Sequence, residues 1–237
     1  MLLFYIRHGD PIYSPDSLTE RGLKQADALP VRLKTLNLDR LYASSSNRAI
    51  LTGKPTAELL GKELEILDFC NEAYAFADMS FPLSDGQRTW CWNCPEVRDF
   101  LKSEEVRLLD KKWYDHPYFA NTKFKQGFTR IENETYAFLD SLGYTFSSER
   151  SGFIPTRPND ERIALFAHQG FGLCFLSVLT DIPFPRFISH FDMSHTGVTV
   201  IEFNGDGIVY PKVLQLSNDS HLFSLGLDTM YNNEIKL

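Results

Sequence analysis

Short unbroken apolar runs, each followed by polar residues, are the feature that most limits how this chain can fold. Residues 2–6 (LLFYI) form the first run, which ends abruptly at residues 7–9 (RHG). Residues 162–167 (RIALFA) form a similar run, which ends at residues 168–170 (HQG). A strand that is apolar at nearly every position is typical of a parallel sheet covered by helices on both faces. These runs therefore predict an α/β protein.

Helical segments alternate with the predicted strands at both ends of the chain. Further strands are expected over residues 41–44, 64–67, 198–203 and 208–216, the last two joined as a hairpin by a turn at residues 204–207. Helices are expected from a cap at Thr19 to about residue 36, over residues 48–60 and over residues 171–179. Pro30 is expected to kink or split the first helix, and Pro55 to disturb the second. Residues 145–160 have the turn-residue content of an exposed loop.

The middle of the chain, roughly residues 76–128, does not show this alternation of strands and helices. It is rich in aromatic and charged residues and predicts an inserted, mainly helical cap over one edge of the sheet. We therefore expect a single domain over residues 1–237, a three-layer sandwich with a mostly parallel central sheet flanked by helices. The aromatic residues of the insertion favour a small core of its own over a substrate platform; they are Trp90, Trp92, Trp113, Tyr114, Tyr118 and Phe119.

Composition excludes several classes of function. The 237 residues include 24 Lys+Arg and 31 Asp+Glu, a formal net charge of −7. Such a chain is not expected to bind nucleic acid, because that affinity comes from phosphate neutralisation by Lys and Arg. No apolar run approaches the ~20 residues of a membrane helix, and the first run is too short for a signal peptide. A cytoplasmic protein without a membrane partner is expected, whereas the oligomeric state stays unknown.

Polar side chains follow the predicted strands at the edge where ligands bind in an open α/β sheet. In chain order they are Arg7, His8, Arg48, Glu72 and His168. Two guanidiniums offer forked, permanently charged donors that match phosphate oxygens. A neutral imidazole is a competent nucleophile towards phosphorus, and a carboxyl group can protonate the leaving oxygen and later activate water. The set is complete for phosphoryl transfer through a phosphohistidine, without a metal.

Four segments in chain order carry a resemblance to a known family. They are residues 7–9 (RHG), 18–26 (LTERGLKQA), 42–49 (YASSSNRA) and 166–170 (FAHQG). In this order and placement, the first three resemble the RHG, LTxxGxxQA and SSxxxRA motifs of the histidine phosphatase (phosphoglycerate-mutase-like) superfamily. The fourth resembles that family's late strand followed by a histidine. The resemblance covers roughly half of the chain.

The resemblance implies a role for each residue. His8 would become the phosphohistidine, and Arg7, Arg48 and His168 would hold the phosphoryl group. Glu72 sits where the family places its general acid and base, although Glu63, Glu65 and Asp78 are nearby carboxylates. A cation at a helix start is disfavoured by the helix dipole, which favours a bound anion beside Arg48. Tyr13, Gln169 and His195 are expected to line the substrate pocket, unless His195 orients a loop instead.

These residues predict a metal-independent phosphomonoester hydrolase with no cofactor. It would act on a small phosphorylated metabolite and release inorganic phosphate. One alternative is a phosphoglycerate-mutase-type phosphotransferase, but residues 10–13 (DPIY) replace the family's mutase run after RHG. A second alternative is a non-catalytic module that binds a phospho-ligand or a protein on the same fold.

A metal hydrolase is a third alternative. The chain has no HxH or HExxH pattern. Cys91 and Cys94 form a CxxC pair, but no second pair exists to complete a zinc site. The sequence therefore predicts no metal.

Overall fold

A six-stranded sheet in the order β12-β11-β1-β10-β4-β5 forms the centre of the computed structural model, which describes residues 1–232 and 235. Four neighbouring strands run parallel: β1 (Leu2–Arg7), β10 (Arg162–Ala167), β4 (Arg40–Ser44) and β5 (Leu64–Leu67). β11 (Val198–Glu202) pairs antiparallel with β1, and β12 (Lys212–Asn218) pairs antiparallel with β11. The prediction of a mostly parallel central sheet is confirmed.

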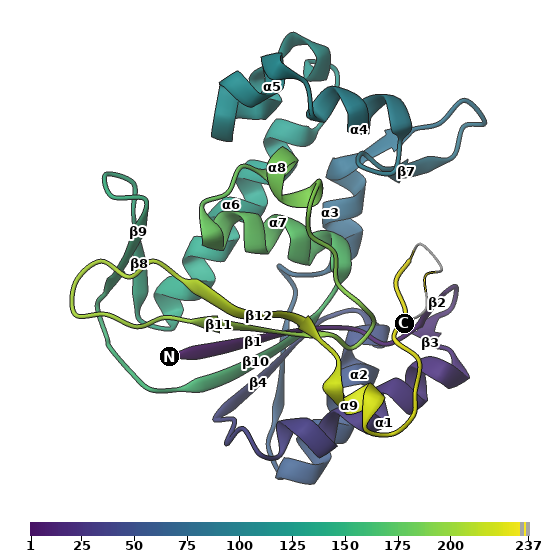
Figure 1. Ribbon diagram of the computed structural model, residues 1–237, viewed down its shortest axis with the longest axis vertical. Coiled ribbons are helices and arrows are strands. Elements are labelled where there is room, and N and C mark those ends of the chain that lie inside the picture. The colour runs from purple at the N-terminus through teal and green to yellow at the C-terminus, as the bar shows by residue number, and fades with distance from the viewer. Residues whose placement is uncertain (233–234, 236–237) are drawn as a thin grey trace.

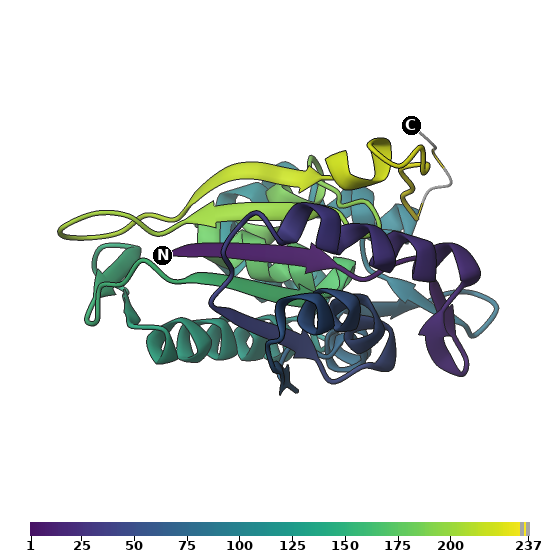
Figure 2. The same cartoon turned by 90° about the horizontal axis from the view of Figure 1, so that it is seen from below.

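Helices cover both faces of this sheet (Figures 1 and 2). α1 (Glu20–Leu33), α2 (Asn47–Leu60) and α9 (Ser220–Phe223) lie on one side; α3 (Glu72–Met79), α6 (Phe124–Ser141), α7 (Gln169–Thr180) and α8 (Phe184–Ile188) lie on the other. Successive side chains of a strand point to opposite faces, so β1 contributes to two cores. Phe4 and Ile6 pack under α1 and α2, whereas Leu3 and Tyr5 pack towards α7. The predicted α/β class is confirmed.

Two helices contain an internal proline and continue through it. α1 begins where the Thr19 hydroxyl accepts the Gly22 N–H at 3.0 Å, and it runs unbroken through Pro30 to Leu33. Pro55 likewise lies inside α2. The expected split at Pro30 was wrong, because the buried face of α1 packs against α2 and retains the helix despite one missing hydrogen bond.

Residues 145–155 are not the exposed loop that their turn residues predict, whereas residues 156–160 do form an irregular and largely exposed segment. β8 (Tyr144–Ser147) and β9 (Gly152–Pro155) form an antiparallel hairpin. Phe146 stacks on Tyr136 of α6 with ring centroids 3.9 Å apart, and Phe153 is 1% exposed. Packing against α6 therefore decides the fold of residues 144–155, and the turn residues mark the tip of the hairpin and the segment that follows it.

The same hairpin explains a second difference. The strand expected from residue 208 begins at Lys212 instead. Val209 exchanges two backbone hydrogen bonds of 2.8 Å with Phe153, so this part of the chain pairs with β9 before it joins β11.

Residues 76–128 extend outward beyond α3, α6 and α7, at the top of Figure 1. They contain β6 (Ser80–Pro82), β7 (Arg88–Trp90), α4 (Pro95–Leu101), α5 (Glu104–Leu109) and two 3-10 helices, η1 (Asp110–Asp115) and η2 (Pro117–Phe119). α3 begins before this range and α6 ends after it, so its two ends lie inside helices that cover the sheet. Among the described residues, no helix combines the length and the apolar character needed to cross a membrane.

The β8–β9 hairpin gives a test of the fold. Phe153→Ala is expected to lower the free energy of unfolding by about 3–5 kcal/mol, because it removes a buried ring from the core. Ile154, its neighbour on β9, is 45% exposed, so Ile154→Ala is expected to change that free energy by about 0.5 kcal/mol or less. Denaturant unfolding measures both values. Equally small losses for the two variants would contradict a packed hairpin.

Candidate active site

The carboxyl ends of four neighbouring parallel strands bring five predicted residues into one buried cluster. Arg7 ends β1 and His8 follows it, Arg48 lies in the first turn of α2 after β4, Glu72 begins α3 after β5, and His168 follows β10. One ring nitrogen of His8, one of His168 and a carboxylate oxygen of Glu72 lie within 4.8 Å of one another. His8 is 1% exposed, His168 0% and Glu72 8%. The sheet thus assembles groups that are more than 60 residues apart in the chain.

His8 is held in one orientation by its neighbouring glycine. Its Nδ1 lies 2.7 Å from the Gly9 carbonyl oxygen. Because a carbonyl only accepts, this contact assigns the ring proton to Nδ1 and leaves the Nε2 lone pair available. Burial lowers the pKa of His8 well below its ordinary value, and His168, Arg7 and Arg48 lower it further. The imidazole is therefore neutral, which is the nucleophilic form.

Gly9 itself is fixed by a close backbone approach. A Cβ at this position would lie 2.6 Å from the Gly22 carbonyl oxygen, in the first turns of α1. The Gly9 N–H donates to the Thr52 hydroxyl at 3.0 Å. The carbonyl that orients His8 is therefore anchored to both α1 and α2.

The hydroxyls of two serines orient the His168 ring through its Nε2 atom, whereas His8 is held through Nδ1. His168 Nε2 lies 2.8 Å from the Ser44 hydroxyl and 3.1 Å from the Ser46 hydroxyl. When a serine donates to Nε2, the ring proton lies on Nδ1, which is 3.6 Å from Glu72 Oε2. Burial lowers the pKa of His168 well below its ordinary value, and Arg48 and Arg7 add to this effect. A neutral His168 can then offer its Nδ1–H to an oxygen of a bound phosphoryl group.

Glu72 and Arg48 form a buried ion pair. Glu72 Oε1 accepts the Gly170 backbone N–H at 2.8 Å, and Oε2 accepts from Arg48 Nη2 at 3.0 Å. Arg48 Nη1 donates to Asp16 at 2.8 Å. The helix dipole favours an anion beside Arg48, and two carboxylates of the protein, Asp16 and Glu72, already lie there. The short β2–β3 hairpin (Pro11–Tyr13 and Asp16–Leu18), which the sequence did not indicate, supplies Asp16.

Arg7 is held by residues from the end of the chain. Its Nη1 donates to the Met193 carbonyl at 2.5 Å, and its Nη2 contacts His195 Nε2 at 2.7 Å and the Asn232 side-chain oxygen. His195 is 3% exposed and is engaged with Arg7 rather than with open space. Of the two roles considered for His195, this contact fits orientation. No pattern in the sequence indicates Met193 or Asn232, which meet Arg7 only through the tertiary fold.

A cavity of about 640 Å³ opens over Arg48 and Glu72. Tyr13 lines it, as expected, and is 65% exposed with the Arg48 guanidinium 5.4 Å from its ring centre. Its other lining residues are Asp16, Ser45, Ser46, Asn47, Asn71, Ala73, Phe76 and Trp90. The sequence did not single out Phe76, and it assigned Trp90 to the core of the insertion.

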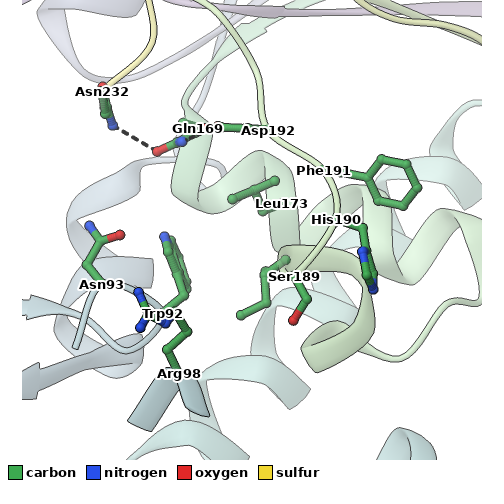
Figure 3. Close-up of a pocket in the computed structure, with 11 residues that line it drawn as sticks. Trp92, Asn93, Arg98, Gln169, Leu173, Ser189, His190, Phe191, Asp192 and Asn232 are labelled. Atoms are coloured by element: carbon green, nitrogen blue, oxygen red, sulfur yellow. Dashed lines mark hydrogen bonds between the residues drawn. The ribbon is translucent and has the colours of Figure 1, made fainter. Parts of the chain in front are cut away.

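Figure 3 shows the residues that line a second cavity, of about 570 Å³. Trp90 lines the first cavity and Trp92 the second, and their stacked rings have centroids 4.6 Å apart. Gln169 lines this second cavity, not the one over Glu72. Its side chain is fixed between Asp192 and Asn232, the latter at 2.9 Å.

The donors of His8, His168 and Glu72 are of the types that zinc prefers. Their surroundings favour an anion instead. Arg48 already donates to Glu72, and the positive charges of Arg7 and Arg48 act on both histidines. A metal ion would have to bind next to two permanent cations, whereas a phosphoryl group would be attracted by them.

The buried histidines predict a fall in stability at acidic pH. Burial, aided by Arg32, lowers the pKa of His221 to about 4. Between this value and the unfolded pKa near 6.5, the unfolded chain binds a proton that the native protein does not. The free energy of unfolding should therefore fall as pH falls through this window, by up to about 1.4 kcal/mol per pH unit for each such histidine.

His221→Asn should reduce that slope between pH 6.5 and 4, as measured by denaturant unfolding at a series of pH values. An unchanged slope in the variant would contradict the assignment of a depressed pKa to His221.

Residues 3–79 match the sequence model of the family described as "Histidine phosphatase superfamily (branch 1)". This stretch includes Arg7, His8, Arg48 and Glu72 but not His168. No curated protein matches the chain.

Solved structures of similar fold include several phosphatases. A phosphoserine phosphatase mutant from Entamoeba histolytica, in complex with phosphoserine, is 16% identical with a TM-score of 0.59, and the match covers 93% of this chain and 98% of that one. A mycobacterial glucosyl-3-phosphoglycerate phosphatase is 16% identical with a TM-score of 0.61, covering 92% and 99%. The alpha-ribazole phosphatase from Shigella flexneri is 20% identical with a TM-score of 0.57, covering 92% and 97%. At these identities the likeness establishes the fold. The resemblance to the histidine phosphatase superfamily is thus confirmed by sequence over residues 3–79, and the solved structures share the fold over nearly the whole chain.

Proposed function

We propose that the protein is a metal-independent phosphomonoester hydrolase that forms a covalent phosphohistidine on His8. The observation that carries this proposal is the state of His8. Its Nδ1 is bound to the Gly9 carbonyl, its Nε2 is available, and its pKa is held well below the ordinary value. A neutral imidazole beside two guanidiniums and a carboxyl group has what an in-line attack on a phosphoryl group needs.

In the first step, a phosphomonoester dianion binds among Arg7, Arg48 and His168. Arg48 Nη2 exchanges its contact with Glu72 for a phosphoryl oxygen, and His168 offers its Nδ1 proton to another. His8 Nε2 attacks phosphorus, so an N–P bond forms while the P–O ester bond breaks. Glu72, released from Arg48 and carrying a proton taken up from solvent, protonates the leaving oxygen, which departs as an alcohol.

In the second step, water attacks the same phosphorus. The Glu72 carboxylate takes a proton from this water, the N–P bond breaks, and inorganic phosphate leaves with His8 neutral again. The Gly170 N–H, 2.8 Å from Glu72 Oε1, keeps the carboxyl group in place through both steps.

A small phosphorylated metabolite remains the proposed substrate. The three solved structures named above are phosphatases, which supports hydrolysis over the mutase alternative. The presence of Arg7, His8, Arg48, Glu72 and His168 in one cluster supports catalysis over a purely binding role. The four cysteines are buried and unpaired, which is compatible with the cytoplasmic location expected from the sequence.

Hydrolysis of p-nitrophenyl phosphate with excess chelator tests the proposal. Wild-type activity is expected to survive the chelator. His8→Ala should lower kcat at least about a thousand-fold, because no other group supplies the nucleophile. Glu72→Gln should lower kcat by about a hundred-fold or more, because proton transfer is lost.

His190→Ala, which removes an exposed histidine outside the cluster, serves as the matched control and is expected to retain activity. Activity that disappears with the chelator, or that persists in His8→Ala, would refute the mechanism.

A further inference from the structure

We infer that the cavity over Glu72 selects phosphomonoesters whose leaving group is an uncharged aromatic, with Trp90 as its principal contact. This inference rests on the proposed function, because it assigns a substrate class to the same site. It also revises the sequence-based interpretation of the aromatic residues. Trp113 and Phe119 are buried in the insertion, whereas Trp90 is half-buried and lines the cavity.

The position of Glu72 decides which cavity receives the leaving group. The ester oxygen must lie beside the group that protonates it, and the remainder of the substrate extends from that oxygen. Glu72 and Arg48 both line the 640 Å³ cavity, and neither lines the second cavity. Its volume falls within the range of roughly 300–1,000 Å³ typical of small-molecule sites.

Trp90 is held firmly next to the acid. A Cβ on Gly170 would lie 2.3 Å from the indole ring, so the ring rests directly on this glycine. The N–H of the same Gly170 donates to Glu72. Trp92 stacks on Trp90, and Phe76 meets it edge to face with centroids 5.1 Å apart and planes at 85°. Such preorganised aromatic surface favours a flat ring over a flexible aliphatic chain.

The charges of the cavity disfavour an anionic leaving group. Arg48 is the only Lys or Arg among the lining residues that the structure describes, and its two terminal nitrogens already pair with Asp16 and Glu72. A carboxylate on the substrate would find no free cation and would lie near Asp16. A desolvated anion without a partner is strongly disfavoured.

The polar groups at the rim of the cavity are also engaged. Asn71 donates to the Ser45 hydroxyl at 2.8 Å, and Ser45 donates to Asp68 at 2.6 Å. Asn47 donates its side-chain N–H to the Asp16 carbonyl at 2.8 Å. Because these groups bond within the protein, the aromatic wall offers the main free contact surface.

Binding of three non-hydrolysable phosphonates, measured by calorimetry, tests the inference without requiring turnover. The compounds are 2-phenylethylphosphonate, propylphosphonate and 3-phosphonopropionate, which differ only in an aromatic, a methyl or a carboxylate terminus. We expect 2-phenylethylphosphonate to bind about ten-fold more tightly than propylphosphonate, because of its aromatic contacts. We expect 3-phosphonopropionate to bind more weakly than propylphosphonate.

Variants of Trp90 and Phe191 show which cavity produces the preference for the phenyl compound. Trp90→Leu should remove most of the preference for the phenyl compound while leaving the affinity for propylphosphonate unchanged, and Trp90→Phe should restore much of that preference. A general loss of structure would weaken all three compounds together. Phe191→Leu, which alters an aromatic residue of the second cavity only, is the control and should keep the preference.

Equal binding of the phenyl and propyl compounds, or tighter binding of 3-phosphonopropionate, would overturn this inference and leave the proposed function standing. A preference that survives in Trp90→Leu but is lost in Phe191→Leu would move the leaving group to the second cavity. Failure of all three compounds to bind the wild-type protein would refute both proposals, because no phosphoryl site would then exist.

Discussion

The parallel pairing of β1 with β10 fixes the geometry on which the site depends. Its register sets Arg7 opposite Ala167, and the His8 N–H donates to the Ala167 carbonyl at 2.9 Å. The two histidines that follow these strands therefore emerge side by side, with ring centroids 5.2 Å apart. A shift of one residue in this register would send each side chain to the opposite face of the sheet. Burial of both faces by helices makes such a shift prohibitive.

The two arginines of the site have different partners. Arg48 lies between the carboxylates of Asp16 and Glu72, whereas Arg7 is held by neutral groups, namely the Met193 carbonyl, His195 and Asn232. Burial lowers the pKa values of His8 and His168, and the positive charges of both arginines lower them further. A phosphoryl dianion then competes with Glu72 for Arg48, which couples substrate binding to release of the proposed acid.

Local patterns predicted the strands and the polar residues at their ends, because unbroken apolar runs have few alternative folds in a chain of this composition. Arg7 and His8 could be found in this way, since polar residues directly after a buried strand point to the sheet edge. The contacts that Asn232 and Asp16 make with the arginines could not be predicted. Each reaches its arginine through a tertiary approach that leaves no periodic pattern in the sequence.

Trp90 and Phe153 illustrate the same limit for aromatic residues. The sequence around an aromatic residue in an irregular segment fits three positions equally well: a hydrophobic core, the protein surface or a substrate-binding wall. Only its packing partners distinguish these states: Gly170 and Phe76 for Trp90, and the rings of Tyr136 and Phe203 for Phe153. For the same reason turn residues predicted a loop where β8 and β9 form a hairpin.

Direct detection of the phosphoenzyme tests the central claim. Glu72→Gln should slow the attack of water, so this variant is mixed with substrate, quenched in denaturant at alkaline pH and digested for mass spectrometry. The account predicts an acid-labile phosphoryl group on the peptide that contains His8, and none on that peptide from the His8→Ala protein. Turnover by the wild-type enzyme without such an adduct, or a phosphoryl group on another residue, would contradict it.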